Sequence, residues 1–478
     1  MSTMASRLLK SDAGVRALIL FIVTVFCFGV SAHAQEVTAT INGIVTDPAG
    51  RVVTNAEVKA QDLDRGTVWP ARTNGSGFYS LSHLPIGRYK VNVKVAGFKA
   101  AVVSPIELQL NQVSAVNFQL VVGSEDQTVQ VTTAAPLLQT DTTDVGTVID
   151  ARTNVSLPLA SRNYLQLTLL TPGAVTVQPA GFENGQNAGQ VARPEINGNR
   201  FDANTYLLDG MDNNDAGSNY VAYSPQPDAI QEFRVITQNA PADFGNYMGG
   251  VISASIKEGT NSLHGTVFEF FRNDKLNANE WMNKLVPGNT IARQKMRWNE
   301  FGGTIGGPIL KNKLFFFADY QAERFDFPST SSLITVFTAK ERTGDMSELV
   351  AAGKNIVDPL TGLPFPNNVI PKDRLSTAAL AILNSKYYPT PINSLIQGNA
   401  YNTTAKKTDD DQGDGRLDYA ASDKDHFMGR FSYAHMTNPT INSFALDYNP
   451  YGVVSTWNFV TGYIRTISAS MANDARLV

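Results

Sequence analysis

The histidine, serine and glycine residues that could carry catalysis match no catalytic template. No histidine stands in the H-E-x-x-H setting that binds a catalytic zinc ion. The five histidines are His33, His83, His264, His426 and His435. The serine of Gly75-Ser76-Gly77 is not in the G-x-S-x-G turn of hydrolases, and no G-x-x-x-x-G-K-[ST] phosphate loop occurs. We therefore expect no enzyme, no cofactor and no resident metal.

One acidic stretch, Asp409 to Gly415, is similar to a calcium-binding loop. Counted from Asp410, however, the third position is Gln412 and the twelfth is Ala421, where the EF-hand template needs an acidic or amide side chain and a glutamate. Calcium binding therefore competes with the simpler interpretation that this stretch is a turn leading into a strand over residues 416–421.

A second polar cluster combines carboxylates and amides within seven residues. It consists of Asp209, Asp212, Asn213, Asn214 and Asp215. Such side chains could bind a cation or the hydroxyl groups of a sugar. They could also satisfy the backbone of their own turn, as Asp and Asn commonly do. Both interpretations stay open from the sequence.

The N-terminus has the pattern of a secretory signal peptide over residues 1–34. Three basic residues precede the apolar run Ala17 to Val30, and the small-residue triplet Ala32-His33-Ala34 follows. We expect cleavage between Ala34 and Gln35. The alternative, a membrane anchor, would need ~20 apolar residues.

Loss of this leader would leave a chain without cysteine, because Cys27 is the only one. No disulfide or thiolate site is then possible. From 39 basic and 43 acidic side chains the leader removes Arg7, Lys10, Arg16 and Asp12, which leaves 36 and 42 and a net charge of −6. That balance argues against nucleic-acid binding. No later stretch is apolar for even ~18 residues, so a membrane-embedded form would have to be a closed barrel.

Residues 38–120 show short strands separated by turn signals. In the segment 88–95, Tyr89, Val91, Val93 and Val95 alternate with polar residues, which predicts a strand with one buried face. The blocks Gly43 to Gly50, Thr73 to Phe78 and Leu84 to Phe98 resemble the carboxypeptidase regulatory-like domain. The resemblance implies a prealbumin-like β-sandwich without peptidase chemistry.

Residues 124–257 are polar and interrupted by prolines, and they predict a small α+β domain. Three segments, Asn204 to Asn214, Ala229 to Ile236 and Ala242 to Asn261, resemble the plug of TonB-dependent outer-membrane receptors, especially the Oar-like group. The resemblance makes Asp209 to Asp215 a candidate ligand-facing plug loop.

Residues 262–478 alternate aromatic and polar side chains, as in Leu314 to Ala322 and His426 to His435. This period is typical of transmembrane barrel strands. The blocks Phe268 to Asp274 and Phe301 to Tyr320 resemble the Oar-like barrel. We therefore expect a mainly β protein: the sandwich, the plug, and then roughly eight strands of a 22-stranded transmembrane β-barrel, so that the printed chain would be a fragment.

The resemblance also implies a partner and a location. The stretch containing Thr128, Val129, Gln130, Val131 and Thr132 is similar to a TonB box, which would pair with the TonB complex by strand addition. A linker strand of the sandwich is the alternative. The implied function is import of an unknown extracellular substrate (oligosaccharide, peptide or metal chelate) through the lipid of the outer membrane, with the sandwich in the periplasm. A structural or adhesion protein and a secreted carbohydrate-binding sandwich are the other hypotheses.

Overall fold

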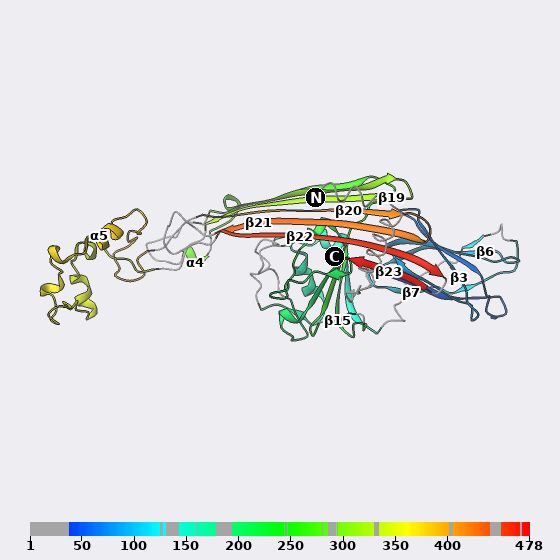
Figure 1. Cartoon of the computed structure of the whole chain (residues 1–478), viewed down its shortest axis with the longest axis horizontal. Coiled ribbons are helices and arrows are strands. Elements are labelled where there is room, and N and C mark those ends of the chain that lie inside the picture. The colour runs from blue at the N-terminus through cyan, green and yellow to red at the C-terminus, as the bar shows by residue number, and fades with distance from the viewer. Residues whose placement is uncertain are drawn as a thin grey trace, which may run out of the picture.

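The computed structural model describes residues 38–124, 128–130, 143–159, 161–177, 194–242, 244–245, 247–279, 281–284, 293, 295–328, 334–400, 405–439, 451–468 and 471–478. The predicted cleavage site, Ala34 and Gln35, and two residues of the predicted TonB box, Val131 and Thr132, lie outside these ranges. The described part consists of a sandwich, a middle domain and a long curved sheet (Figure 1).

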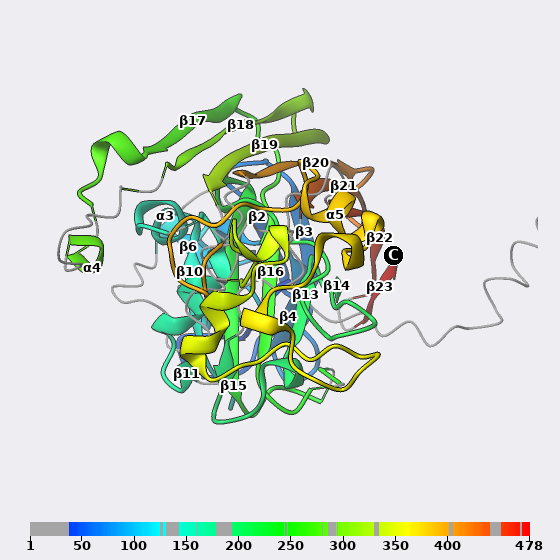
Figure 2. The same cartoon turned by 90° about the vertical axis from the view of Figure 1, so that its left-hand side faces the viewer.

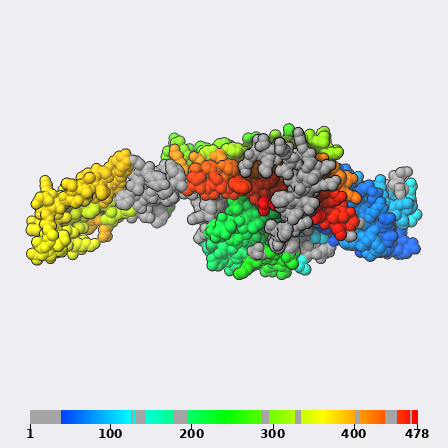
Figure 3. Space-filling model, viewed as in Figure 1, coloured from blue at the N-terminus to red at the C-terminus, as the bar shows by residue number. Residues whose placement is uncertain are grey.

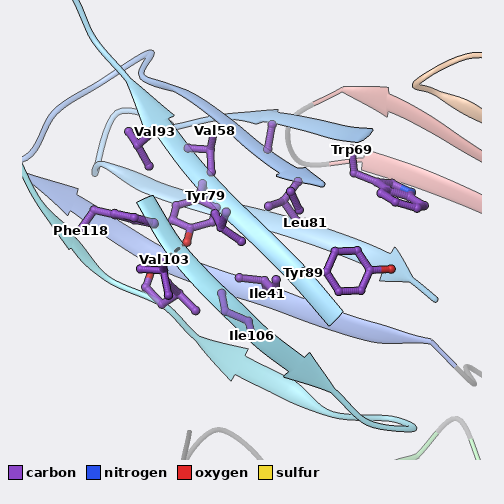
Figure 4. Packing of buried hydrophobic residues seen from close by; sticks show 14 of the residues in the cluster. Ile41, Val58, Trp69, Tyr79, Leu81, Tyr89, Val93, Val103, Ile106 and Phe118 are labelled. Atoms are coloured by element: carbon purple, nitrogen blue, oxygen red, sulfur yellow. Dashed lines mark hydrogen bonds between the residues drawn. The ribbon is translucent and has the colours of Figure 1, made fainter. Parts of the chain in front are cut away.

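The sandwich has two sheets that enclose an apolar core. The first contains β1 (Ala39–Thr46), β4 (Phe78–Leu84), β7 (Val113–Ala115) and β8 (Phe118–Gln119). The second, in the order β3-β2-β5-β6-β9, contains β2 (Glu57–Asp62), β3 (Val68–Arg72), β5 (Gly87–Lys94), β6 (Ala100–Leu108) and β9 (Thr128–Gln130). Side chains from both sheets, including Tyr79, Tyr89 and Phe118, interdigitate in the core (Figure 4). The alternation predicted for residues 88–95 is confirmed, because Tyr89, Val91 and Val93 are fully buried.

The middle domain is a five-stranded sheet with short helices. Its strand order is β10-β15-β16-β13-β14. The strands are β10 (Val145–Asp150), β13 (Thr205–Leu208), β14 (Met211–Asp212), β15 (Ile230–Gln238) and β16 (Val251–Ile256), beside the small pair β11 (Ala174–Val175) and β12 (Glu195–Ile196). The helices are α3 (Ala151–Ser156) and the 3₁₀ turns η1 (Tyr164–Leu170), η3 (Phe201–Ala203) and η4 (Pro227–Ala229).

The long sheet consists of antiparallel strands that pair in chain order. They are β17 (His264–Asn273), β18 (Arg297–Leu310), β19 (Leu314–Pro328), β20 (Ala405–Ala420), β21 (Asp425–Pro439), β22 (Tyr451–Ser468) and β23 (Met471–Leu477). Within the described ranges these are seven strands, against the roughly eight that we expected. In Figure 2 they follow one another along an arc over the middle domain.

The two ends of the long sheet differ. Short turns such as residues 421–424 lie on the side of the sandwich, whereas the long connection between β19 and β20 projects from the other end (Figures 1 and 3). That connection contains η6 (Glu341–Thr343), η7 (Ser347–Ala352), η8 (Pro366–Asn368), η9 (Lys372–Arg374) and α5 (Thr377–Leu383). The short elements η5 (Asp274–Leu276) and α4 (Trp281–Lys284) follow β17 at the same end.

The alternation of β19 is visible as burial. Phe315 and Phe317 point toward the middle domain and are 2% and 1% exposed, whereas Tyr320 on the other face is 47% exposed. None of the described helices is long and apolar enough to cross a membrane.

The stretch Asp409 to Gly415 is neither a calcium loop nor a turn. It lies within the continuous strand β20, where residues 409–415 pair with β19. Asp410, Gln412 and Asp414 are buried against the middle domain. The prediction of a turn was wrong because Asp and Gly are turn formers in water, whereas the inner face of this sheet is polar and accepts them in a strand.

Candidate functional site

The candidate site begins at Asp209, in the tight turn between β13 and β14. Asp209 and Gly210 both have positive φ angles, 49° and 77°, as an Asp-Gly hairpin turn requires. The Asp209 carboxylate is turned back onto β16, where its Oδ1 accepts hydrogen bonds from the backbone nitrogen of Ile256 at 3.0 Å and from Ser255 Oγ at 3.3 Å. Only 1% of the residue is exposed.

Three arginines of the long sheet converge on this turn. Arg430 Nε lies 2.7 Å from Asp209 Oδ2, and Arg416 Nη1 lies 3.3 Å from Oδ1. Arg476 Nη1 donates to the Asp209 carbonyl oxygen at 2.7 Å. Since the three arginines come from β21, β20 and β23, one residue of the middle domain is bound to three strands of the long sheet.

The ion pairs continue from Arg416 into the sandwich. Arg416 Nη2 lies 2.7 Å from Glu258 Oε1, and Arg65 Nη2 lies 3.0 Å from Glu258 Oε2. Arg65 also pairs with Asp62 at 2.6 Å. We call this series the ionic chain; from the sandwich to the long sheet it is Asp62, Arg65, Glu258, Arg416, Asp209, Arg430 and Asp414.

The residues of the ionic chain are buried except for Glu258, which is half-buried, so each charge depends on its partners. Burial alone lowers the pKa of the Arg65 guanidinium, but Glu258 and Asp62 outweigh burial and leave that pKa above its ordinary value. An ion buried without its partner costs about 3–5 kcal/mol, although a complete buried pair contributes little net stability. The arrangement therefore specifies how the three parts fit together more than it stabilises them.

A cavity of about 100 Å³ lies beside the ionic chain, lined by Arg65, Trp69, Ser255, Glu258 and His426 among others. Its wall includes the Trp69 ring of the sandwich stacked on the His426 ring of β21, with centroids 4.9 Å apart. The lining of the cavity is mostly apolar, with the charged groups of the ionic chain on one side, and the cavity is large enough for a few water molecules. It marks the junction of the sandwich, the middle domain and the long sheet.

A second contact joins the sandwich to β15. The Leu110 backbone nitrogen donates to Glu232, and Arg234 Nη1 donates to the carbonyl oxygens of Leu110 and Asn111 at 3.1 and 2.8 Å. Arg234 Nη2 also pairs with Asp144 at 2.5 Å. Burial raises the pKa of Glu232 to about 7, although the hydrogen bond from Leu110 and the charge of Arg234 act to lower it.

The residues of the predicted ligand loop lie in two different environments. Asp209 lies at the sandwich end of β13, buried among arginines. Asp212 to Asp215 run back along β13 toward its other end, where Asn214 Oδ1 accepts from the Tyr206 backbone nitrogen at 2.7 Å. Asp212 and Asp215 are exposed, and each carboxylate accepts a backbone N–H from within its own loop.

A larger cavity lies between the middle domain and the first two strands of the long sheet, at the end away from the sandwich. Its volume is about 370 Å³, and its lining includes Asn154, Arg162, Phe270, Phe271, Arg272, Trp298 and Glu300. The Arg162 guanidinium lies 4.2 and 4.3 Å from the ring centroids of Phe268 and Phe270. This mixed lining of rings, cations and one carboxylate suits a ligand that has both polar groups and an apolar face.

The predicted TonB box is described only in part. Residues Thr128 to Gln130 form β9, which pairs in parallel with Ala100 to Val102 at the edge of the second sandwich sheet. Among the described residues no group of three metal-binding side chains occurs.

Sequence reasoning missed the arginines of the long sheet and the acids that bind them. Arg430 stands at an inward position of a strand whose alternation was recognised, and Arg416 is the first residue of the strand expected over residues 416–421. A charge at an inward position was the available signal, because charged groups facing a packed interior need partners.

Comparison with known proteins identifies two parts of the chain. A family model described as carboxypeptidase regulatory-like domain matches residues 40–121, and one described as outer membrane beta barrel domain matches residues 255–478. The TonB-dependent transporter Oar of Myxococcus xanthus is 31% identical over 323 residues, which cover 64% of this chain and 28% of that protein. The chain thus spans less than a third of this curated relative.

Two solved structures show more distant similarity. The outer membrane transporter YddB from Escherichia coli is 13% identical with a TM-score of 0.44, covering 67% of this chain and 37% of that one. The ferric enterobactin receptor of Pseudomonas aeruginosa is 11% identical with a TM-score of 0.39, covering 69% and 40%. From the sequence matches, the chain is a homologue of the TonB-dependent transporter Oar and a protein of the cell outer membrane, with a carboxypeptidase regulatory-like domain ahead of its outer membrane beta barrel domain.

Proposed function

We propose that this chain is part of a TonB-dependent transporter that imports a large or scarce substrate across the outer membrane. In this proposal the long sheet is part of the barrel wall, and the middle domain, close to the predicted residues 124–257, is the plug. The substrate classes remain oligosaccharides, peptides and metal chelates. The role is transport, not catalysis.

The observation that carries the proposal is the attachment of Asp209 to three strands of the long sheet. A domain that only filled a barrel could be held by apolar packing. A plug that must rearrange and return is better served by ion pairs, because these fix one geometry and can be replaced by water when the plug moves. The ionic chain is such an attachment.

Substrate would first meet the end of the molecule away from the sandwich. The connection over residues 334–400, the exposed part of the polar loop from Asp212 to Asp215, and the cavity beside Trp298 all lie toward that end. We assign the ligand contacts to these groups, and we assign Asp209 to the attachment of the plug.

TonB would bind the segment from Thr128 to Thr132 by strand addition. The pairing of β9 with a sheet edge supports this assignment in one respect, because the segment already adopts an extended backbone that forms a ladder. For TonB to take the segment, β9 would have to leave β6.

The test compares two substitutions at one residue of the full-length protein, Val129→Pro and Val129→Ala. Proline removes a backbone donor and blocks strand pairing, whereas alanine leaves the backbone intact. We expect the proline variant to bind the C-terminal domain of TonB about tenfold more weakly, and the alanine variant to bind like the parent. Binding would be measured by calorimetry on purified protein.

Equal binding by both variants would remove this segment as the TonB box. A second measurement tests transport itself. The test uses cells that carry the full-length protein in their outer membrane. The structural role is favoured if these cells show no energy-dependent uptake of any oligosaccharide, peptide or chelate tested and if deletion of the gene causes cell-envelope defects. The secreted carbohydrate-binding sandwich is not proposed, since the chain carries an outer membrane beta barrel domain.

A further inference from the structure

The sandwich contacts the middle domain at two separate places, and these contacts have a consequence for movement. At the first, the β2–β3 turn meets the segment between the middle domain and the long sheet. Asn261 donates from its backbone nitrogen to the Asp64 carbonyl oxygen at 3.0 Å and from Nδ2 to the Arg65 carbonyl oxygen at 2.7 Å. The ion pair of Arg65 with Glu258 is added to these hydrogen bonds.

At the second place, the β6–β7 turn meets β15 through Glu232 and Arg234. These contacts are hydrogen bonds to backbone atoms of Leu110 and Asn111; Leu110, Glu232 and Arg234 are buried, and Asn111 is half-buried. Because one contact is on β15 and the other on the segment that follows β16, the sandwich cannot turn about either one. The sandwich is therefore held in a fixed orientation on the middle domain, and it is not joined to it by a flexible linker alone.

We infer that the sandwich is a cap on the middle domain, bound at these two places, and that the middle domain moves only when the cap detaches. The inference rests on the proposed function in that it takes the middle domain to be a plug that moves. The partner of this surface of the sandwich is the chain's own middle domain.

Arg234 couples the cap to the segment on which TonB would act. One guanidinium binds both the two carbonyl oxygens of the sandwich turn and the carboxylate of Asp144. Asp144 directly precedes β10, the first strand of the middle domain. Tension on the chain before Asp144 would draw this carboxylate away, and Arg234 would lose the group that holds it against the sandwich.

The contacts are of a kind that allows release. The contacts at the two places are hydrogen bonds and ion pairs, which exchange for contacts with water at a small net cost once the groups are exposed. The stacked rings of Trp69 and His426, between the sandwich and the long sheet, would separate with them. At the first place Asp62 stays with Arg65 when the cap leaves, and Arg416 stays with Glu258, so neither side of that contact would be left with an unpaired charge. Detachment at the first place divides the ionic chain between Arg65 and Glu258.

The test uses a single cysteine as a reporter under the cap. The chain has no cysteine besides Cys27, in the predicted leader. Ser255 lines the cavity beneath the sandwich and is 7% exposed, so Ser255→Cys should react slowly with a membrane-impermeant maleimide in the full-length protein. Ser253→Cys, on the same strand and 0% exposed, is the matched control that does not line this cavity.

Two substitutions weaken the first contact in different ways. Arg65→Gln removes the ion pairs with Glu258 and Asp62. Asn261→Ala removes the side-chain hydrogen bonds to Arg65 and Asn312 and leaves every residue of the sandwich unchanged. A hydrogen bond involving a charged group corresponds to about tenfold in an equilibrium. We therefore expect Arg65→Gln to raise the labelling rate at residue 255 by about tenfold, Asn261→Ala to raise it less, and neither to change labelling at residue 253.

Hydrogen exchange of β5 shows whether the sandwich of the Arg65→Gln variant is still folded. If it is not, the labelling rate of the Asn261→Ala variant is the test. Unchanged labelling at residue 255 in both variants, with a folded sandwich, would overturn the cap. Fast labelling already in the parent would also overturn it. The assay needs neither substrate nor TonB, so its outcome is independent of whether the chain transports.

Discussion

Asp209 illustrates how much one residue can determine in this molecule. Its carboxylate and carbonyl oxygen receive three arginines, and its neighbours offer no second carboxylate within the same turn. We expect Asp209→Asn to destabilise the seating of the middle domain by about 1–3 kcal/mol, because Arg416 and Arg430 lose one carboxylate partner but keep Glu258 and Asp414, while the packing volume is kept. The loss would appear as a lower urea midpoint of the full-length protein in detergent.

Asp212→Asn is the matched control for this measurement. Asp212 is two residues from the turn and is exposed. Its carboxylate accepts a hydrogen bond from the backbone nitrogen of Asn214. Its substitution should leave the midpoint within about 0.5 kcal/mol. Equal effects of the two substitutions would show that the arginines do not depend on Asp209.

Glu232 should make the seating of the sandwich depend on pH. Its pKa is raised to about 7 from an ordinary value of 4.5, chiefly by burial, with Asp150 adding to the rise. The folded state therefore holds the proton more tightly than the unfolded state does. Stability from this group is fully present below pH 4.5 and is lost as the pH rises through about 7.

Glu232→Gln cannot ionise and still offers an oxygen to Leu110. We expect it to remove most of the decline in stability between about pH 5 and about pH 8, a difference of about 1–3 kcal/mol. Thermal unfolding at both pH values measures the effect. A parent protein whose stability is flat over this interval would contradict the assigned pKa.

The sequence drew attention to Asp209 without revealing its role. An Asp-Gly pair between apolar residues indicates a tight turn, and that much is found. Its arginine partners lie 207 to 267 residues further along the chain. Nothing in a local pattern selects Arg416 or Arg476 from the other arginines, because the pairing arises only when the strands are in register.

At the scale of elements, periodicity predicted where the strands lie better than it predicted which side chains face the middle domain. The alternation of Leu314 to Ala322 and His426 to His435 corresponds to β19 and β21, and its aromatic residues lie mostly on the exposed face. Asp409 to Gly415 was misassigned because its composition is that of a turn. Polar residues mark a loop only where the strand faces are apolar, and here the inner face of the sheet contacts a polar domain.

Glycines in the long sheet differ in what they allow, and the difference is testable. A Cβ atom at Gly302 of β18 would lie 2.1 Å from the Tyr320 carbonyl oxygen and 2.9 Å from Gln321 Cα, whereas one at Gly415 of β20 would meet nothing within 4 Å. We expect Gly302→Ala to force β18 and β19 apart locally and to cost about 1–3 kcal/mol. Gly415→Ala should be neutral or slightly stabilising.

The measurement is gel electrophoresis in detergent without heating the sample. It gives the fraction of the protein that still migrates as the folded, compact form. This fraction reports the assembled sheet and needs no substrate. Comparable fractions for the two alanine variants would mean that the backbone of β18 gives way without cost.

At the scale of the whole molecule, the order of the parts is readable from the sequence and their contacts are not. Turn signals, polar composition and aromatic alternation distinguish the three parts along the chain. The seating of the sandwich depends on Arg65 meeting Glu258 and on Leu110 meeting Glu232, and these residues belong to no repeated pattern. The ionic chain gives the three parts a single geometry that no one part specifies.

This geometry predicts that a covalent bond between the sandwich and the base of the long sheet would stop a transport cycle. The backbone hydrogen bond from Asn261 to Asp64 brings these residues within reach of a disulfide. In Asp64→Cys with Asn261→Cys, the oxidised full-length protein should bind substrate like the parent but lose TonB-dependent uptake, since the cap cannot detach. Reduction should restore uptake.

The control is a disulfide that leaves the cap free. Glu57 and Arg72 are directly opposite each other on β2 and β3, within the sandwich, and Glu57→Cys with Arg72→Cys joins only these strands. We expect this pair to transport in both redox states. Uptake by the oxidised Asp64 and Asn261 pair at the rate of this control would show that the plug opens beneath a seated sandwich. Loss of uptake in the first pair alone would locate the obligatory movement at the sandwich and not in the plug by itself.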